Sequence, residues 1–191
     1  MRISQDDQKY NSRIRKIFVN SLMKNILSQI VQSQAINIID IGCGEGFPDR
    51  YFLNRRKELK ITGVDLNKES INKAKNKNPQ ASYRQGDIYS LKVDSKFDLA
   101  LVMEVLEHLR NPQEALFEVK KVAPLAIFSV PHEPWFSFFS FVSGKYLKTW
   151  GKHPGHLNFW NRASLEQILK NYYSQVKVYP SFPWLMAVCR K

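Results

Sequence analysis

The chain of 191 residues is 43% hydrophobic, which is enough to bury the core of one domain and too little for two. Its 29 Lys and Arg against 17 Asp and Glu give a formal net charge of +12, which attracts nucleic acid or an anionic membrane surface without choosing between them. The chain has two cysteines, Cys43 and Cys189, which exclude a disulfide framework. Its N-terminus is polar and no long apolar run occurs, which argues against export or membrane insertion. We therefore expect one cytoplasmic domain over 1–191.

The first predicted element is an amphipathic helix over 12–34. Apolar residues recur there at the spacing of one helix face, and the basic face is expected to point outward. The apolar positions are Ile14, Ile17, Phe18, Leu22, Ile26, Leu27, Ile30 and Val31.

Short apolar runs then alternate with helical segments. Strands are predicted over 36–41, 60–65, 81–86, 97–103 and 124–130, with helices near 47–57, 67–76 and 111–122. This alternation predicts βαβ crossovers and a doubly wound α/β fold, with a mostly parallel sheet covered by helices on both faces. A helix near 162–172 and two final runs, 176–180 and 184–190, predict a closing hairpin and hence an antiparallel last strand. The predicted sheet therefore has seven strands.

The segment 131–160 departs from this rhythm. It is rich in aromatic residues, Gly, Pro and His, and it is long for a connection inside a compact domain. We expect it to form a lid over the substrate site.

A glycine-rich loop follows the first predicted strand, in IIDIGCGEGF over 38–47. Gly42 and Gly44 allow a tight turn and a close approach of the backbone to a ligand, and Gly46 allows the next helix to begin against the strand. Asp40 adds an acceptor for a cationic group. A dinucleotide-binding loop would have its third glycine one residue later, and Glu45 at the helix start would repel a pyrophosphate. The spacing therefore disfavours an NAD-dependent reductase.

Two acidic residues end the next two predicted strands, Asp65 in ITGVDLN and Asp87 in RQGDI. Carboxylates at these strand ends, beside the glycine loop, surround one crevice that suits an adenosine carrying a sulfonium and an ammonium group. The alternative is that each aspartate merely caps the helix that follows.

DIGCGEG, GVDLN, QGDI and FDLALVMEVLEHL, in this order, resemble the successive motifs of class I S-adenosylmethionine-dependent methyltransferases, a Rossmann-like family. The resemblance covers about 36–130. It implies S-adenosyl-L-methionine as cofactor, with Asp65 at the ribose hydroxyls and Asp87 with Ile88 at the adenine. The full cofactor-binding set implied in this way is Asp40, Gly42, Cys43, Gly44, Gly46, Asp65, Leu66, Asp87, Ile88, Met103 and Glu104.

The string EVLEHL also resembles part of the metal site of small-RNA 3′-terminal 2′-O-methyltransferases. That resemblance implies a metal bound by Glu104, Glu107, His108 and the later His156. The same string occurs in metal-free small-molecule methyltransferases, including the ubiquinone-pathway O-methyltransferases. We therefore predict no metal, and keep a metal-dependent RNA ribose 2′-O-methyltransferase as the alternative.

The aromatic and lysine-rich part of the lid, 135–150, favours peripheral contact with a membrane, at its inner face. Stacking on RNA is the rival use of such residues. The resemblance to ubiquinone-pathway enzymes points to the membrane, and hence to a small-molecule or lipid-like substrate.

Histidines near the lid could accept a proton from the substrate hydroxyl during methyl transfer. The candidates are His108, His132 and His156, and His108 has the best claim because it follows the fourth strand. The sequence therefore predicts O-methylation of a small or lipid-like molecule. A non-catalytic methyltransferase-like binding module is a further alternative, which the intact glycine loop and both carboxylates disfavour.

Overall fold

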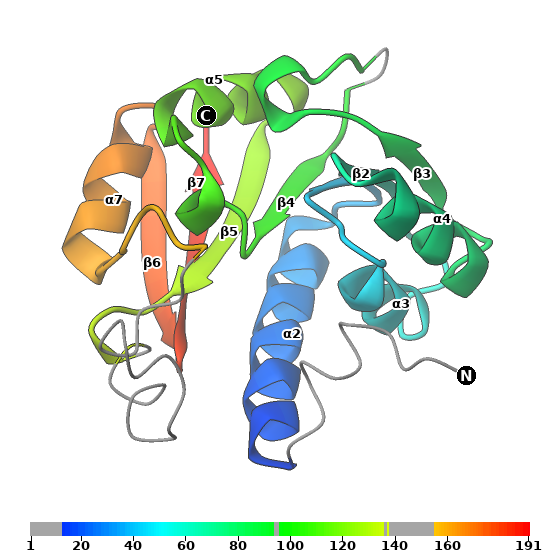
Figure 1. Ribbon diagram of the computed structural model, residues 1–191, viewed down its shortest axis with the longest axis horizontal. Coiled ribbons are helices and arrows are strands. Elements are labelled where there is room, and N and C mark those ends of the chain that lie inside the picture. The colour runs from blue at the N-terminus through cyan, green and yellow to red at the C-terminus, as the bar shows by residue number, and fades with distance from the viewer. Residues whose placement is uncertain (1–12, 94–95, 136, 138–154) are drawn as a thin grey trace.

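The computed structural model describes residues 13–93, 96–135, 137 and 155–191. The described chain forms one seven-stranded sheet with helices packed against it (Figure 1). The strands are β1 (Asn37–Ile41), β2 (Lys60–Asp65), β3 (Ser82–Gln85), β4 (Leu99–Met103), β5 (Leu125–Pro131), β6 (Gln175–Ser181) and β7 (Trp184–Arg190). The helices are α2 (Arg13–Ser33), α3 (Phe47–Leu53), α4 (Lys68–Lys77), α5 (Pro112–Val122) and α7 (Arg162–Lys170), with short 3₁₀ turns η1 (Ile88–Ser90) and η2 (Leu106–His108).

The strand order, β3-β2-β1-β4-β5-β7-β6, confirms the predicted doubly wound topology. The first five strands are parallel, and β7 runs antiparallel to both β5 and β6. The antiparallel last strand is therefore confirmed, and it lies one place inside the edge, where β6 is outermost. The order reverses between β1 and β4, so the carboxyl ends of these strands border the crevice where ligands bind in such folds.

Two apolar cores lie on opposite faces of the sheet. On one face, α5 and α7 bury Leu116 and Leu165 against the sheet, while α2 and α3 bury Ile26 and Phe52 against the other (Figure 1). Helix α4 packs Ile71 and Ala74 near the glycine loop. β4 and β5 are buried along their whole length, which explains why their sequences are continuous apolar runs rather than alternating ones.

The buried face of α2 differs from the predicted one. Its core residues are Val19, Leu22, Met23, Ile26 and Ile30, at the spacing of a single narrow stripe. Ile17 and Val31, which the apolar pattern assigned to the core, are 66% and 44% exposed. Too many apolar residues occupy α2 for one stripe, so the contact with β6 and β7 decides which of them are covered.

The other predicted elements match closely, with shorter ends in two helices. α3 ends at Leu53 rather than at residue 57, and α7 ends at Lys170 rather than at residue 172. None of the helices in the described ranges is long and apolar enough to cross a membrane. Of the predicted lid over 131–160, the structure describes 131–135, 137 and 155–160.

Candidate active site

The glycine loop connects β1 to α3 through backbone angles that only glycine adopts easily. Gly42, Gly44 and Gly46 have φ values of 79°, 54° and 72°. The amides of Gly42 and Cys43 both donate to the carbonyl of Val64, at 2.7 and 3.1 Å, and so attach the loop to the end of β2. A Cβ at position 42 would lie 2.3 Å from Cγ2 of Val105. The loop therefore requires glycine for both conformation and space.

Asp65 ends β2 and is fixed against this loop. Its Oδ2 accepts a hydrogen bond from the amide of Gly44 at 2.9 Å, and its Oδ1 accepts one from the amide of Asn67 at 2.8 Å. The residue that caps α4 is Asn67, whose side chain accepts from the amides of Glu69 and Ser70. The capping alternative for Asp65 is therefore wrong. Its carboxylate is half-exposed and retains further acceptor positions, as a ribose diol requires.

Asp87 follows β3 and does cap a turn. Its Oδ1 accepts from the amide of Tyr89 at 3.0 Å and begins η1, with Ile88 buried behind it. The neighbouring candidate Leu66 is 68% exposed. The assignment of Asp87 with Ile88 to adenine, and of Leu66 to the cofactor, stays a prediction.

Asp40, at the carboxyl end of β1, is an unmatched buried acid. It is 1% exposed, and no N–H or hydroxyl group in the described ranges donates to it. Its side-chain neighbour is the buried carboxyl of Asp49, so burial, reinforced by Asp49 and Asp65, raises the pKa of Asp40 well above its usual range. Burial thus favours the neutral form of Asp40, and a cation beside it would favour the ionised form, as the ammonium or sulfonium group of the expected cofactor would. The residues present therefore fit S-adenosylmethionine.

A buried network that sequence reasoning missed lies behind the loop. Tyr83 donates to Oδ2 of Asp49 at 2.7 Å, while Nδ2 of Asn78 donates to the Tyr83 hydroxyl at 2.9 Å and to the carbonyl of Gly46 at 2.8 Å. Burial raises the pKa of Asp49 to about 6. No sequence signal distinguished Asp49 from an exposed acid in the first turn of a helix.

The charge of Glu45 is compensated locally. The residue is buried, and its carboxylate forms ion pairs with Lys73 at 3.1 Å and Lys77 at 2.6 Å, both from α4. Repulsion of a pyrophosphate by Glu45 is therefore no longer an argument against a dinucleotide, although the glycine spacing still is. Burial, followed by the nearby acids, raises the pKa of the Cys43 thiol, which makes it an inert filler of the loop.

The end of β4 leads into a second group of polar side chains. Met103 is buried, and Glu104 has a φ of 56°, a strained value for a residue with a side chain. Helical spacing had suggested that Glu104 shares a surface with Glu107 and His108. The helical turn begins only at Leu106, so Glu104 precedes it.

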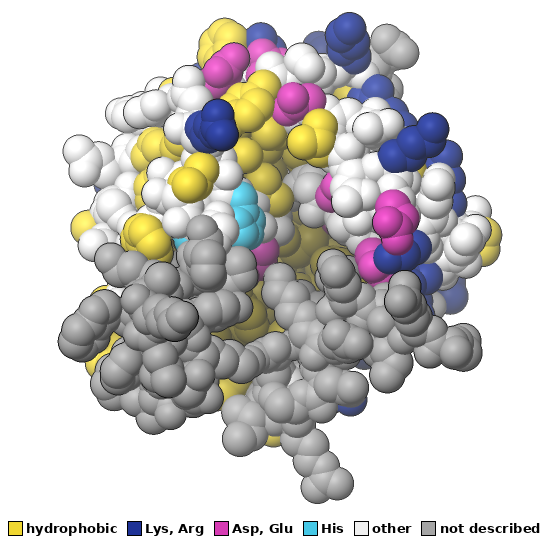
Figure 2. Space-filling model, viewed as in Figure 1, with side chains coloured by type: hydrophobic (Ala, Val, Ile, Leu, Met, Phe, Trp, Pro, Cys, Tyr) yellow, Lys and Arg dark blue, Asp and Glu magenta, His cyan; other side chains and the backbone are white. Residues whose placement is uncertain are grey.

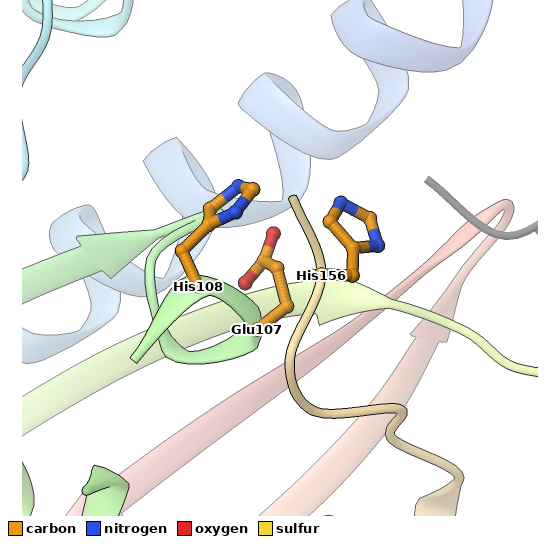
Figure 3. Close-up of side chains that lie close together, drawn as sticks. All are labelled: Glu107, His108 and His156. Carbon is orange, nitrogen blue, oxygen red and sulfur yellow. The ribbon is translucent and has the colours of Figure 1, made fainter. Parts of the chain in front are cut away.

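Glu107, His108 and His156 come together at this point, with the carboxylate between the two rings (Figure 3). One ligand atom from each of the three lies within 4.8 Å of the other two, and the ring centroids of His108 and His156 are 5.0 Å apart. The group contains three of the four residues implied for a metal site. His108 is exposed and His156 is half-buried. Figure 2 shows histidine side chains at the surface beside hydrophobic ones.

The segment that brings His156 here is Gly155–Trp160, which we call the return segment. It is attached to η2 by backbone hydrogen bonds and by the side chain of Asn158, which sequence reasoning did not single out. His132, the third candidate base, directly follows β5, where it forms an isolated β-bridge with Trp160 rather than joining His108. Most of the aromatic part of the lid falls outside the described residues.

Comparisons with known proteins agree with this geometry. A family model described as a methyltransferase domain matches residues 39–124. The ubiquinone biosynthesis O-methyltransferase of Rickettsia bellii is 24% identical over 169 residues, covering 83% of this chain and 70% of that protein.

Two solved structures share the fold. The methyltransferase domain of bacterial CtHen1-C superposes with a TM-score of 0.73 at 21% identity, over 91% of this chain and 98% of that one. The plantazolicin methyltransferase BpumL, solved with S-adenosylhomocysteine, gives 0.77 at 18% identity, over 98% and 90%.

Three features suit S-adenosylmethionine: the strand order, the glycine loop beside Asp65, and Asp40, the buried acid at the end of β1. The methyltransferase-domain match and the relatives named as methyltransferases support an enzyme over the non-catalytic alternative. The chain is a class I S-adenosylmethionine-dependent methyltransferase.

Proposed function

We propose that the enzyme methylates a hydroxyl oxygen of a small or lipid-like molecule, with His108 as the base. The observation that carries this proposal is the hydrogen bond between Nδ1 of His108 and the carbonyl of Gly155, at 2.8 Å. A carbonyl cannot donate, so in the neutral ring Nδ1 carries the proton and Nε2 carries the lone pair. A base with a fixed tautomer thus lies just past the end of β4.

S-adenosylmethionine, when bound, supplies an electrophilic methyl group on a sulfonium sulfur. The glycine loop and Asp65 would hold the cofactor, and Asp40, ionised beside it, would offset part of its positive charge. His108 would take the proton of the acceptor hydroxyl at Nε2 as the oxygen bonds to the methyl carbon, the bond from that carbon to the sulfonium sulfur breaks, and S-adenosylhomocysteine leaves. Alignment of the two reacting atoms provides most of the acceleration, and the base adds about 10²–10⁴-fold.

An apolar side chain lies beside this site. Phe159 is 39% exposed, and its ring centroid lies 6.4 Å from that of His156. Such a side chain favours an acceptor whose hydroxyl is carried on an apolar body. The name of the Rickettsia bellii relative points to a substrate of this kind.

A second candidate is metal-dependent 2′-O-methylation of RNA ribose. The grouping of Glu107, His108 and His156 favours it, because two imidazoles and one carboxylate suit a divalent transition metal. A metal there would hold the ribose hydroxyls, and the net charge of +12 would attract the RNA backbone.

Methyl transfer to two acceptors separates these candidates. One is a long-chain phenol in detergent, and the other is a short RNA with a free 3′-terminal ribose, each assayed with a chelator and with Mn²⁺. We expect chelator-resistant transfer to the phenol, lowered about 10²–10⁴-fold by His108→Gln and far less by His132→Gln. Manganese-dependent transfer to RNA alone would replace the first proposal by the second.

We also propose a cytoplasmic enzyme that contacts the inner face of the membrane through 135–150. The lysines and aromatic residues of this segment support it, although most of them lie outside the described residues. Co-sedimentation with anionic and neutral vesicles tests it, and equal recovery without any vesicles would contradict it.

A further inference from the structure

The return segment alternates covered and exposed residues. Its even positions, His156, Asn158 and Trp160, are half-buried or buried, whereas the odd positions are exposed. This period of two is the pattern of an extended chain with one face against the protein. His156 and Asn158 thus face the same way, toward η2.

Hydrogen bonds hold this segment in register with η2. The amides of Leu157 and Asn158 both donate to the carbonyl of Glu107, at 2.7 and 3.0 Å. Nδ2 of Asn158 donates to the carbonyls of Leu106 and Leu109, at 3.1 and 2.7 Å, so both protons of its amide are used.

The two carbonyls that Asn158 reaches lie at the two ends of η2: that of Leu106 also accepts from the amide of Leu109 at 3.4 Å, and that of Leu109 follows the turn. An asparagine side chain is short enough to span them from an adjacent chain and carries two donors on one nitrogen. A shift of the return segment by one residue would exchange its inward and outward faces and remove His156 from Glu107. The amide of Asn158 therefore fixes a register on which the placement of His156 depends.

The carbonyl that selects the tautomer of His108 belongs to the same segment. Gly155 lies three residues before Asn158, and its carbonyl accepts from Nδ1 of His108. One attachment thus serves both histidines, because it places His156 directly and orients His108 through Gly155.

We propose that Asn158 is the positioning residue of the acceptor side, holding His156 beside Glu107 and setting the tautomer of His108. The inference rests on the proposed function only where it predicts an effect on methyl transfer. Its structural part is measured without any acceptor.

The experiment uses the two-bond ¹H–¹⁵N spectrum of the imidazole rings, in the full chain saturated with S-adenosylhomocysteine under mildly alkaline conditions. The chain has four histidines, and His108→Gln assigns the signal of interest. We expect the Nδ1–H tautomer for His108 in the wild type. Asn158→Ala should shift His108 toward the Nε2–H form, leave the Kd for S-adenosylhomocysteine within about twofold and lower kcat by about 10- to 100-fold.

Asn25→Ala is the matched control. Nδ2 of Asn25 donates to Oγ of Ser181 at 3.1 Å, so this variant also loses an asparagine hydrogen bond between distant segments, from helix α2 on the opposite face of the sheet. It should lower stability without changing the tautomer of His108. Asn158→Asp, which keeps the shape and loses both donors, replaces Asn158→Ala if that variant does not fold.

An Nδ1–H tautomer that persists in either folded Asn158 variant overturns the inference. So does an Nε2–H tautomer in the wild type, which needs no variant. A shifted tautomer with unchanged methyl transfer supports the positioning role of Asn158 and rejects His108 as the base, which separates the inference from the proposed function.

Discussion

A side chain at Gly42 should destabilise the protein in two ways, through backbone strain and through overlap with a neighbouring side chain, and the two contributions can be measured separately. Gly42→Ala places a side chain at a φ of 79°, which costs about 1–2 kcal/mol for a residue with a Cβ. It also places that Cβ 2.3 Å from Cγ2 of Val105, far inside normal contact. Overpacking of this kind costs about 1–3 kcal/mol. Together they predict a loss of about 2–5 kcal/mol in the free energy of unfolding.

Val105→Ala removes only the second cost. With Cγ2 gone, the nearest atom of residue 105 to the new Cβ is its own Cβ, at 3.6 Å, which is an ordinary contact. In the double variant, the loss of stability should be about 1–3 kcal/mol smaller than the sum of the two single losses. The backbone strain at Gly42 should remain.

Urea unfolding of the wild type and the three variants gives this coupling energy directly. Calorimetric titration with S-adenosylhomocysteine then shows whether removing the overlap with Val105 also restores the Kd of the glycine loop for its ligand. Additive losses, within about 0.5 kcal/mol, would show that Gly42 and Val105 do not compete for the same space and would refute the reasoning.

Three further predictions concern charges and caps around the same crevice. Asp65→Ala should weaken S-adenosylhomocysteine binding by about 1–3 kcal/mol in calorimetry, and an unchanged Kd would contradict its placement at the ribose. Asn67→Ala, its matched control, should cost about 1 kcal/mol of stability through loss of the α4 cap while leaving that Kd intact. Because burial raises the pKa of Asp49 from 3.8 to about 6, the folded chain holds more protons than the unfolded chain between these values. The free energy of unfolding should therefore fall as the pH rises through this window, by up to about 3 kcal/mol, and equal slopes in wild type and Asp49→Asn would exclude this origin.

The fold was largely predictable because its strands are short apolar runs separated by helices and turn residues. β2 and β7 were predicted to the residue, and the closing hairpin followed from the closeness of its two runs. The covered face of α2 was not predictable, because Ile17 and Val31 are as apolar as the residues that the sheet covers. Local pattern decides which elements form, whereas packing decides which of their side chains are buried.

The candidate site likewise has a part that local sequence predicts and a part that depends on tertiary packing. The place of Asp65 beside the glycine loop was predictable because both follow strand ends, where parallel topology brings residues together. The joining of His156 to Glu107 and His108 depends on the return segment, whose attachment through Asn158 is tertiary and has no sequence spacing of its own. Asp49 was missed for a related reason, since its burial depends on Tyr83 from β3.

The charge of the chain and the charge of its cofactor site have opposite signs. A net +12 predicts that cations are repelled at long range, yet the cofactor carries a sulfonium and an ammonium group. Asp40 and Asp65, at the ends of β1 and β2, and Asp49, in α3, lie close enough to act on one another, and together they favour a cation at short range. Salt screens the exposed lysines more strongly than the buried Asp40 and Asp49, so added salt should weaken the repulsion more than the local attraction. A basic exterior and an acidic cofactor site are therefore compatible in one chain.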